Sequence, residues 1–207
     1  MLLYSLIIII GGIATTILNI FLNPQFQDKL WLYPLITLAL IIISILIDGL
    51  VAFVIRRLPE KWFKEGKGFL KTSYAEMKFY HFIGVHKWKN FVPELGSFTG
   101  FHKNKVDKPF DNEYIGRFIL EARYGVAIHL FSVPTSFLVL LLDIWMYTGP
   151  SNIWLTIALP VAVVNATLIV LPAFVLKFNL WRLVAIYDNN NLKLEKMKQN
   201  ETPESSD

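Results

Sequence analysis

The sequence contains no cysteine and few charged residues, and both shortages narrow what the chain can be. Without cysteine there is no disulfide, no thiolate nucleophile and no cysteine-ligated metal. Charged residues make up 17% of the chain, against about a quarter in a typical soluble domain. Neither a glycine-rich phosphate loop nor a Gly-x-Ser-x-Gly sequence is found. If the chain is an enzyme, direct transfer with a general base is therefore favoured over a covalent intermediate.

The shortage of charge is concentrated in four long apolar runs. About 20 apolar residues cross a hydrocarbon core of roughly 30 Å, and in lipid such a segment satisfies its backbone as a helix. Residues 1–27 lack a basic residue before the apolar core and a small-residue cleavage pattern, so we expect a retained helix rather than a secretion signal. The predicted fold is an all-α integral membrane protein with four transmembrane helices. We expect the spans at about 2–22, 32–55, 124–147 and 152–176.

The predicted organisation is one membrane domain over residues 1–187, followed by a polar tail over 188–207 that we expect to be disordered. Fourteen of the 20 Lys and Arg residues lie between Arg56 and Arg123. Basic residues favour the cytosolic side, so this long loop and both termini are expected to be cytosolic, in a cell-membrane protein. The positive charge then faces membrane lipids, and no nucleic acid partner is predicted.

The loop 56–123 is also rich in aromatic residues mixed with lysines, the composition of segments that lie at a membrane interface. We expect interfacial helices over Pro59–Lys71 and Ala75–Asn90, and a further helix from Glu113 into the third span. One interpretation is that these aromatic residues only anchor the loop to the bilayer. The other is a lid above a lipid-substrate pocket that opens to the inner leaflet.

His129 is the leading candidate for chemistry, because it is a titratable group within an otherwise uncharged span. It lies six residues after Arg123, about 9 Å along a helix, and Asp48 lies eight residues before Arg56, about 12 Å. We therefore expect Asp48 and His129 to meet at similar depth. A neighbouring carboxylate supports a histidine as general base; the alternative is a structural hydrogen bond between helices.

Glu121 shares a helix face with His129, and Arg123 could hold a phosphate or carboxylate in a bidentate manner. The four histidines show neither His-Glu-x-x-His nor His-x-x-x-His spacing, so no metal site is predicted. Asn165 lies in mid-span, where it is best interpreted as a hydrogen-bond donor between helices.

Several segments together resemble one known family. Arg57-Leu58-Pro59-Glu60-Lys61 follows a span, Val85-His86-Lys87-Trp88-Lys89 precedes Pro93-Glu94, and Lys177-Phe178-Asn179 precedes Arg182. In this order they resemble the glycosyl-4,4'-diaponeurosporenoate acyltransferase family, over roughly residues 47–186. This chain departs from the family pattern at His86, where the pattern has arginine. Its first span looks like an addition to the pattern.

The resemblance implies a membrane acyltransferase that moves a fatty acyl chain onto a sugar hydroxyl of a glycosylated lipid or carotenoid. Carried over by position, the family pattern marks Trp88, Lys89, Glu121, His129, Asn179 and Arg182. Together with the positions of the polar residues in the spans, this gives His129, Glu121 and Asp48 as the expected catalytic set. The substrate-binding set is His86, Lys87, Trp88, Lys89, Glu94, Arg123, Asn179 and Arg182.

The expected partners are membrane lipids and a lipid-like glycoside. No cofactor is expected, and the donor substrate is expected to be an acyl thioester, such as acyl-CoA or acyl carrier protein. A homo-oligomer is compatible with the sequence. The alternative function is that of a non-catalytic multi-pass accessory or assembly protein, in which Asp48 and His129 only join helices.

Overall fold

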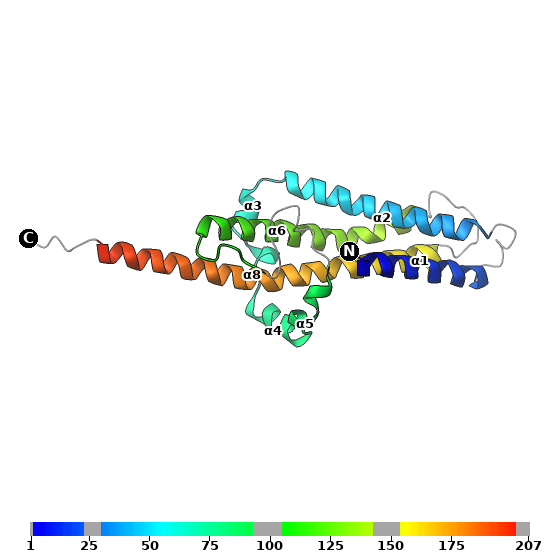
Figure 1. Ribbon diagram of the computed structural model, residues 1–207. Helices are drawn as coiled ribbons and strands as arrows, with labels where there is room; N and C mark the ends of the chain where they lie inside the picture. Colours follow the sequence, from blue (N-terminus) through cyan, green and yellow to red (C-terminus); the bar gives the residue numbers. More distant parts are fainter. Residues whose placement is uncertain (1, 23–29, 93–104, 143–153, 202–207) are drawn as a thin grey trace, which may run out of the picture. The chain divides into compact units, whose positions relative to one another are not determined.

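The computed structural model describes residues 2–22, 30–92, 105–142 and 154–201, and in these ranges the chain is helical with no strand. The predicted all-α class is therefore confirmed. Four helices are long and apolar enough to cross a membrane. They are Leu3–Leu22, Leu32–Arg57, Asn112–Leu140 and Thr156–Asn200. Figure 1 follows the elements along the chain.

The chain divides into two compact units, and the boundary falls within two of its long helices. Unit 1 comprises residues 1–58, 91–93 and 127–173, and unit 2 comprises 59–90, 94–126 and 174–207. Unit 1 holds α1 (Leu2–Leu22), α2 (Leu32–Arg57), the end of α6 (Asn112–Thr135), η5 (Ser136–Leu140), η6 (Trp154–Ala158) and the start of α8 (Leu159–Glu201).

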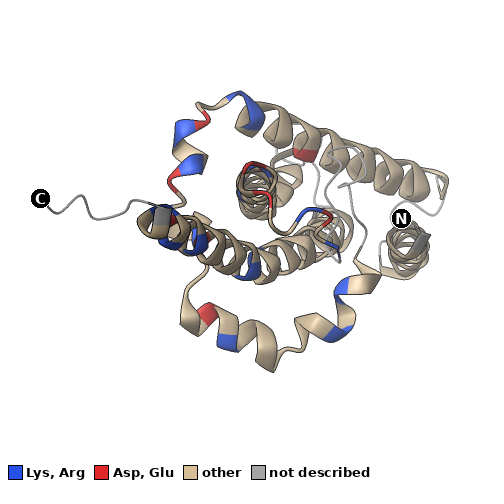
Figure 2. Cartoon of the chain, turned by 60° about the vertical axis from the view of Figure 1, so that its left-hand side comes forward, with Lys and Arg blue, Asp and Glu red and all other residues tan. Residues whose placement is uncertain are grey.

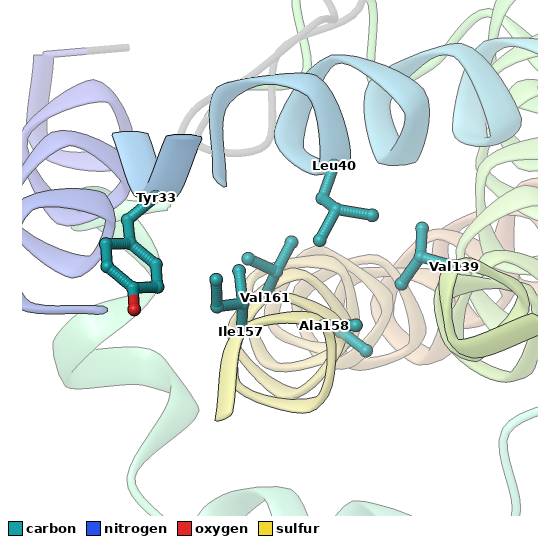
Figure 3. Packing of buried hydrophobic residues seen from close by; sticks show 7 residues of the cluster. Tyr33, Leu40, Val139, Ile157, Ala158 and Val161 are labelled. Carbon is teal, nitrogen blue, oxygen red and sulfur yellow. The ribbon is translucent and has the colours of Figure 1, made fainter. Parts of the chain in front are cut away.

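Unit 1 is held together by aliphatic packing. Leu40 of α2, Val139 of η5 and Ile157 of η6 point toward one another in its core (Figure 3). Leucine and isoleucine side chains cover the outer faces of α1 and α2, for example Ile10 and Leu46, which are 57% and 66% exposed. A helix that is apolar on its outer face as well as its inner one is typical of a lipid environment.

Unit 2 contains the short helices of the long loop and the polar halves of α6 and α8. The short elements are α3 (Lys61–Lys64), η2 (Gly68–Leu70), α4 (Tyr74–Phe82), α5 (Val85–Trp88) and η3 (Lys89–Phe91). Ile115 and Phe118 of α6 pack against Leu180 and Leu183 of α8 to form its core. Most of the Lys and Arg residues lie in these elements, whereas α1 carries none (Figure 2).

The two helices expected within the loop are each interrupted by glycine. Gly66 and Gly68 have φ values of +59° and +57°, which end α3 and separate it from η2. Gly84, with φ of +69°, separates α4 from α5. Glycine adopts this left-handed conformation without the steric cost that other residues meet. The interfacial location of these elements stays a prediction.

The polar tail differs from the expectation of disorder over the part that the structure describes. Helix α8 continues through Glu201. Asn190 is buried and its Nδ2 donates to the carbonyl oxygen of Pro109 at 2.8 Å, while Asn112 Nδ2 donates to Asn191 Oδ1 at 2.5 Å. These side-chain hydrogen bonds hold the helix beyond the last apolar turn, which composition alone does not reveal.

Candidate functional site

A polar cavity of about 860 Å³ lies in unit 2, between α3, α6 and α8. Its charged lining residues come from all three helices and carry both signs. They are Glu60, Lys64, Glu113, Arg117, Glu121, Arg123 and Asp188. A cavity of this size is within the range of small-molecule sites, about 300–1,000 Å³. Two of the predicted site residues, Glu121 and Arg123, therefore line the same cavity.

Arg123 reaches from α6 to the end of α3. Its Nη1 donates to the carbonyl oxygens of Phe63 at 3.0 Å and Lys64 at 2.6 Å. Cations and donors at a helix C-terminus satisfy carbonyls that have no partner within the helix. The Nε–H of Arg123 is buried and has no hydrogen-bond partner among the described residues. The side chain thus fixes α3 and keeps one donor that a bound anion could use.

Gly66 makes the position of Arg123 possible. A Cβ at Gly66 would lie 2.2 Å from Arg123 Nη2. The rings of Phe63 and Tyr124, on either side of this contact, stack at a centroid distance of 4.1 Å. The wall of the cavity at α3 therefore depends on a glycine and an aromatic pair that the sequence interpretation did not single out.

The α5 residues of the predicted set lie beside α8. Trp88 Nε1 donates to the carbonyl oxygen of Ile83 at 3.0 Å, which anchors the short helix to the turn before it. Lys89 Nζ lies 5.9 Å from the centre of the Phe178 ring. His86 and Lys87 are exposed to solvent. The structure thus brings Lys89 close to the Lys177-Phe178-Asn179 segment. Glu94, also predicted to bind substrate, lies outside the described residues.

The remaining predicted residues of unit 2 lie on α8. Asn179 is buried, at 8% exposure, and Arg182 is exposed. Sequence reasoning missed an ion pair of this unit, which joins Lys177 of α8 to Glu76 of α4. The side chain of Lys177 is only 6% exposed. Thr72 Oγ1 also donates to the Lys177 carbonyl oxygen at 2.9 Å.

Glu76 serves two partners at once. Its Oε2 accepts from the backbone N–H of Ser73 at 2.7 Å in a capping box, and its Oε1 binds Lys177. Burial alone would raise the pKa of Glu76, but the hydrogen bonds from Lys177 and Ser73 outweigh it and hold the pKa below its ordinary value. Burial and the charge of Glu76 raise the pKa of nearby Tyr80 to about 12. A Ser-x-x-Glu pattern was the sequence signal for this helix start.

The polar residues of unit 1 form a separate cluster. Asn165 Nδ2 of α8 donates to Asp48 Oδ2 of α2 at 3.1 Å and to Ser136 Oγ at 3.0 Å. The prediction that Asn165 is a donor between helices is confirmed. Asp48 Oδ1 is buried without a hydrogen-bond partner among the described residues.

His129, in the α6 part of unit 1, is only partly buried. Among the described residues Asp48 accepts a hydrogen bond from Asn165, and its expected pairing with His129 stays a prediction. Glu121 belongs to unit 2 and His129 to unit 1, and each is positioned by its own unit.

The described residues contain no group of three or more His, Cys, Asp or Glu side chains close enough to hold a metal ion. The unit 2 cavity itself offers hydrogen-bonding and charged side chains. Arginine and lysine in the unit 2 cavity and on α5 can bind anionic groups, and the carboxylates beside them can accept hydroxyl protons.

Comparison with protein families gives one match. The model described as glycosyl-4,4'-diaponeurosporenoate acyltransferase matches residues 59–189, which is more than half of the chain. The matched range begins at the start of unit 2 and includes Lys89, Glu121, His129 and Arg182. Searches of curated proteins and of solved structures give no match. By this match, the chain belongs to the glycosyl-4,4'-diaponeurosporenoate acyltransferase family, as the sequence motifs predicted.

Proposed function

We propose that the protein transfers a fatty acyl group from an acyl thioester to a sugar hydroxyl of a glycosylated lipid or carotenoid, at the inner leaflet of the cell membrane. The observation that carries this proposal is the family match over residues 59–189. Four helices that are long and apolar enough to cross a membrane support a membrane location, where a lipid-like acceptor would be found. The match does not favour the alternative of a non-catalytic accessory protein.

In the proposed reaction His129 acts as general base. It takes the proton of the sugar hydroxyl as the oxygen attacks the acyl carbonyl carbon, and a tetrahedral intermediate forms. Collapse of the intermediate forms the ester and breaks the carbon–sulfur bond. The thiolate leaves with the proton returned from His129. No bound cofactor is needed for this sequence of steps.

The other predicted residues have supporting roles. Glu121 or Asp48 would orient His129. Asn165 would hold the Asp48 carboxylate, since its Nδ2 donates to Asp48 Oδ2. Lys87, Lys89 and Arg182 would hold donor phosphates. The free Nε–H of Arg123 supports a contact with a substrate anion or with the oxyanion of the intermediate.

The direct test is His129→Ala in membranes, assayed for acylated glycolipid by mass spectrometry. Loss of a general base lowers the rate by about 10²–10⁴-fold. Thr135→Ala is the matched control, because Thr135 is on the same helix and its hydroxyl bonds only to carbonyls of that helix. Full activity of the His129 variant, with protein levels equal to the control, would show that His129 is not the base.

Lys89→Ala tests the donor site. If Lys89 binds a donor phosphate, the variant raises the apparent KM for the thioester more than it lowers kcat. Lys78→Ala is the comparison, since Lys78 also lies over an aromatic ring, 4.8 Å from the centre of Tyr74, but is outside the predicted set. Equal changes in KM and kcat for the two variants would mean that Lys89 contributes only general positive charge and does not bind the donor phosphate.

A further inference from the structure

Helix α4 carries aromatic side chains on both of its faces. Its inner face packs within unit 2 through Met77 and Tyr80, which are buried. Its outer face is formed by three aromatic residues that are all exposed: Tyr74, Phe79 and Phe82. The Phe82 side chain is 88% exposed. A helix beside water normally has polar residues on its outer face, so this face of α4 does not have the composition of a water-facing surface.

The helix is too short to be a membrane span. Nine residues rise about 14 Å, against roughly 30 Å for a hydrocarbon core. The outer face also includes Lys78, whose Nζ lies 4.8 Å from the centre of the Tyr74 ring. A lysine stem can lie along apolar groups while its ammonium group reaches outward. Rings flanked by lysine on one face of a short helix are typical of a helix that lies in a membrane interface.

Contacts with α8 place α4 beside the end of an apolar run. Residues 152–176 are uncharged, and Lys177 is the first charged residue after them. Since about 20 apolar residues cross the hydrocarbon core, a crossing α8 leaves the hydrocarbon near Lys177. Lys177 forms its ion pair with Glu76 of α4, and the Phe174 ring meets Phe79 edge-on at a centroid distance of 6.1 Å. Helix α4 is thus attached to α8 where lipid headgroups would surround it.

The charge around α4 has one sign. Residues 68–92 contain four lysines, at positions 71, 78, 87 and 89, and one acidic residue, Glu76. Because Glu76 is paired with Lys177, the lysines dominate this surface. A second copy of the chain would bring the same lysines and be repelled. An anionic bilayer surface attracts them, and it also accepts aromatic rings at headgroup depth.

We propose that α4 lies on the membrane surface, with Tyr74, Phe79 and Phe82 inserted among anionic lipid headgroups and its lysines on their phosphates. Composition alone predicts interfacial helices over most of the loop. The contacts with α8 and the exposed rings select one face of one helix, at the point where α8 leaves the hydrocarbon. The proposal concerns lipid contact only, so it does not depend on acyl transfer.

The test uses the full-length protein, one copy per nanodisc, in bilayers that contain phosphatidylglycerol. A spin label is attached through Ala75→Cys, because Ala75 is exposed on the outer face of α4 and the chain has no cysteine of its own. Electron paramagnetic resonance then compares the access of oxygen and of a water-soluble nickel chelate to the label. We expect the Ala75 label to lie in lipid, whereas a label on Asn189→Cys, exposed farther along α8, should lie in water.

Phe82→Ser in the Ala75→Cys protein tests the rings. It should lower the ratio of lipid-facing to water-facing label about tenfold, since transfer of one phenyl ring from water is worth about that much affinity. Phe110→Ser is the matched control. Phe110 is also highly exposed, at 83%, and has Lys193 Nζ 6.0 Å from its ring centre, but it lies outside α4. Equal effects of the two substitutions would overturn the proposal.

The charge is tested without any substitution on the rings. Replacing phosphatidylglycerol by phosphatidylcholine, or raising the salt to about 1 M, should also lower the ratio about tenfold, because lysine binding to an anionic surface is lost or screened. An unchanged ratio would overturn the role of anionic lipid. An Ala75 label that stays in water in single-copy nanodiscs, or is covered only when each disc holds two copies, would show that another protein surface and not lipid covers α4.

Discussion

Gly66 and Arg123 provide the sharpest prediction at the scale of single residues. Gly66→Ala places a Cβ 2.2 Å from Arg123 Nη2 and also forces alanine into a φ of +59°. The backbone conformation costs about 1–2 kcal/mol for a non-glycine residue, and crowding in a packed site adds about 1–3 kcal/mol. We expect thermal unfolding in detergent at a clearly lower temperature than for the wild type.

Gly68→Ala separates these two contributions. Gly68 has nearly the same φ, +57°, but an added Cβ meets nothing within 4 Å. It should therefore show the backbone cost alone. Adding Arg123→Ala to Gly66→Ala should restore part of the lost stability, because the clash disappears. Equal destabilisation by Gly66→Ala and Gly68→Ala would mean that the guanidinium moves aside freely.

Arg123 also shows how much of a residue's role can be predicted from its type alone. An arginine beside a glutamate near the end of a span predicts an anion contact, and the residue does line a polar cavity. Its hydrogen bonds to the carbonyls of residues 63 and 64 depend on where the chain folds back, about 60 residues away in sequence. No local pattern encodes that distance, so the positioning role of Arg123 could only be found in the structure.

At the scale of elements, the ion pair of Lys177 with Glu76 joins α4 to α8. Removing one partner of a fully buried pair costs about 3–5 kcal/mol. Here the cost should be smaller, because the Glu76 side chain is 35% exposed. Lys177→Met is expected to lower the unfolding temperature, whereas Lys67→Met should change it little, since the pair of Lys67 with Glu65 is highly exposed. Similar values for the two variants would argue against a link between α4 and α8.

The same pair predicts a dependence on pH. The pKa of Glu76 is lowered on folding from its ordinary value of 4.5, so its contribution to stability is full above that value and is lost as the pH falls through the folded pKa. Wild-type unfolding temperatures measured from pH 7 to pH 3 should therefore fall in the acid range. In Glu76→Gln the unfolding temperature should fall less over this range. An identical fall in both proteins would mean that other carboxylates cause it.

Asn165 connects three helical elements of unit 1. Its amide serves Asp48 of α2 and Ser136 of η5, so Asn165→Ala leaves both without this donor. Unsatisfied buried polar groups cost about 1–3 kcal/mol each. Thr167→Ala is the control, because the Thr167 hydroxyl bonds only within α8. We expect a marked loss of thermal stability for Asn165→Ala and little for Thr167→Ala, and the reverse order would contradict the role of Asn165.

The long helices could be predicted from sequence because each depends on a local run of apolar residues. The elements of the loop could be predicted only in part. Their breaks at Gly66 and Gly84 follow from glycine's conformational freedom, but the contacts of α3 with α6 and of α4 with α8 do not follow from the local sequence. The helical continuation through residue 201 depends likewise on Asn190 and Asn191. Distant partners decide these features, and a window of sequence does not contain them.

At the scale of the whole molecule, four spans and the distribution of basic residues predict that the long loop and the C-terminal segment share the cytosolic side. Two spans separate them, so they must lie on the same side if both helices cross fully. The absence of cysteine makes this testable with single-cysteine variants, because the wild type gives no background. Lys67→Cys and Lys196→Cys report on these segments, and Ser151→Cys reports on the side of the membrane that is reached between the last two spans.

We expect a membrane-impermeant maleimide to label Ser151→Cys in intact cells, and Lys67→Cys and Lys196→Cys only in inverted vesicles. Labelling of Lys67→Cys and Lys196→Cys from opposite sides of the membrane would mean that α6 or the apolar part of α8 does not cross it. Both sites labelled in intact cells would reverse the orientation. The acyl thioester, made in the cytosol, would then not reach Lys89, and the proposed donor site would have to be abandoned along with the topology.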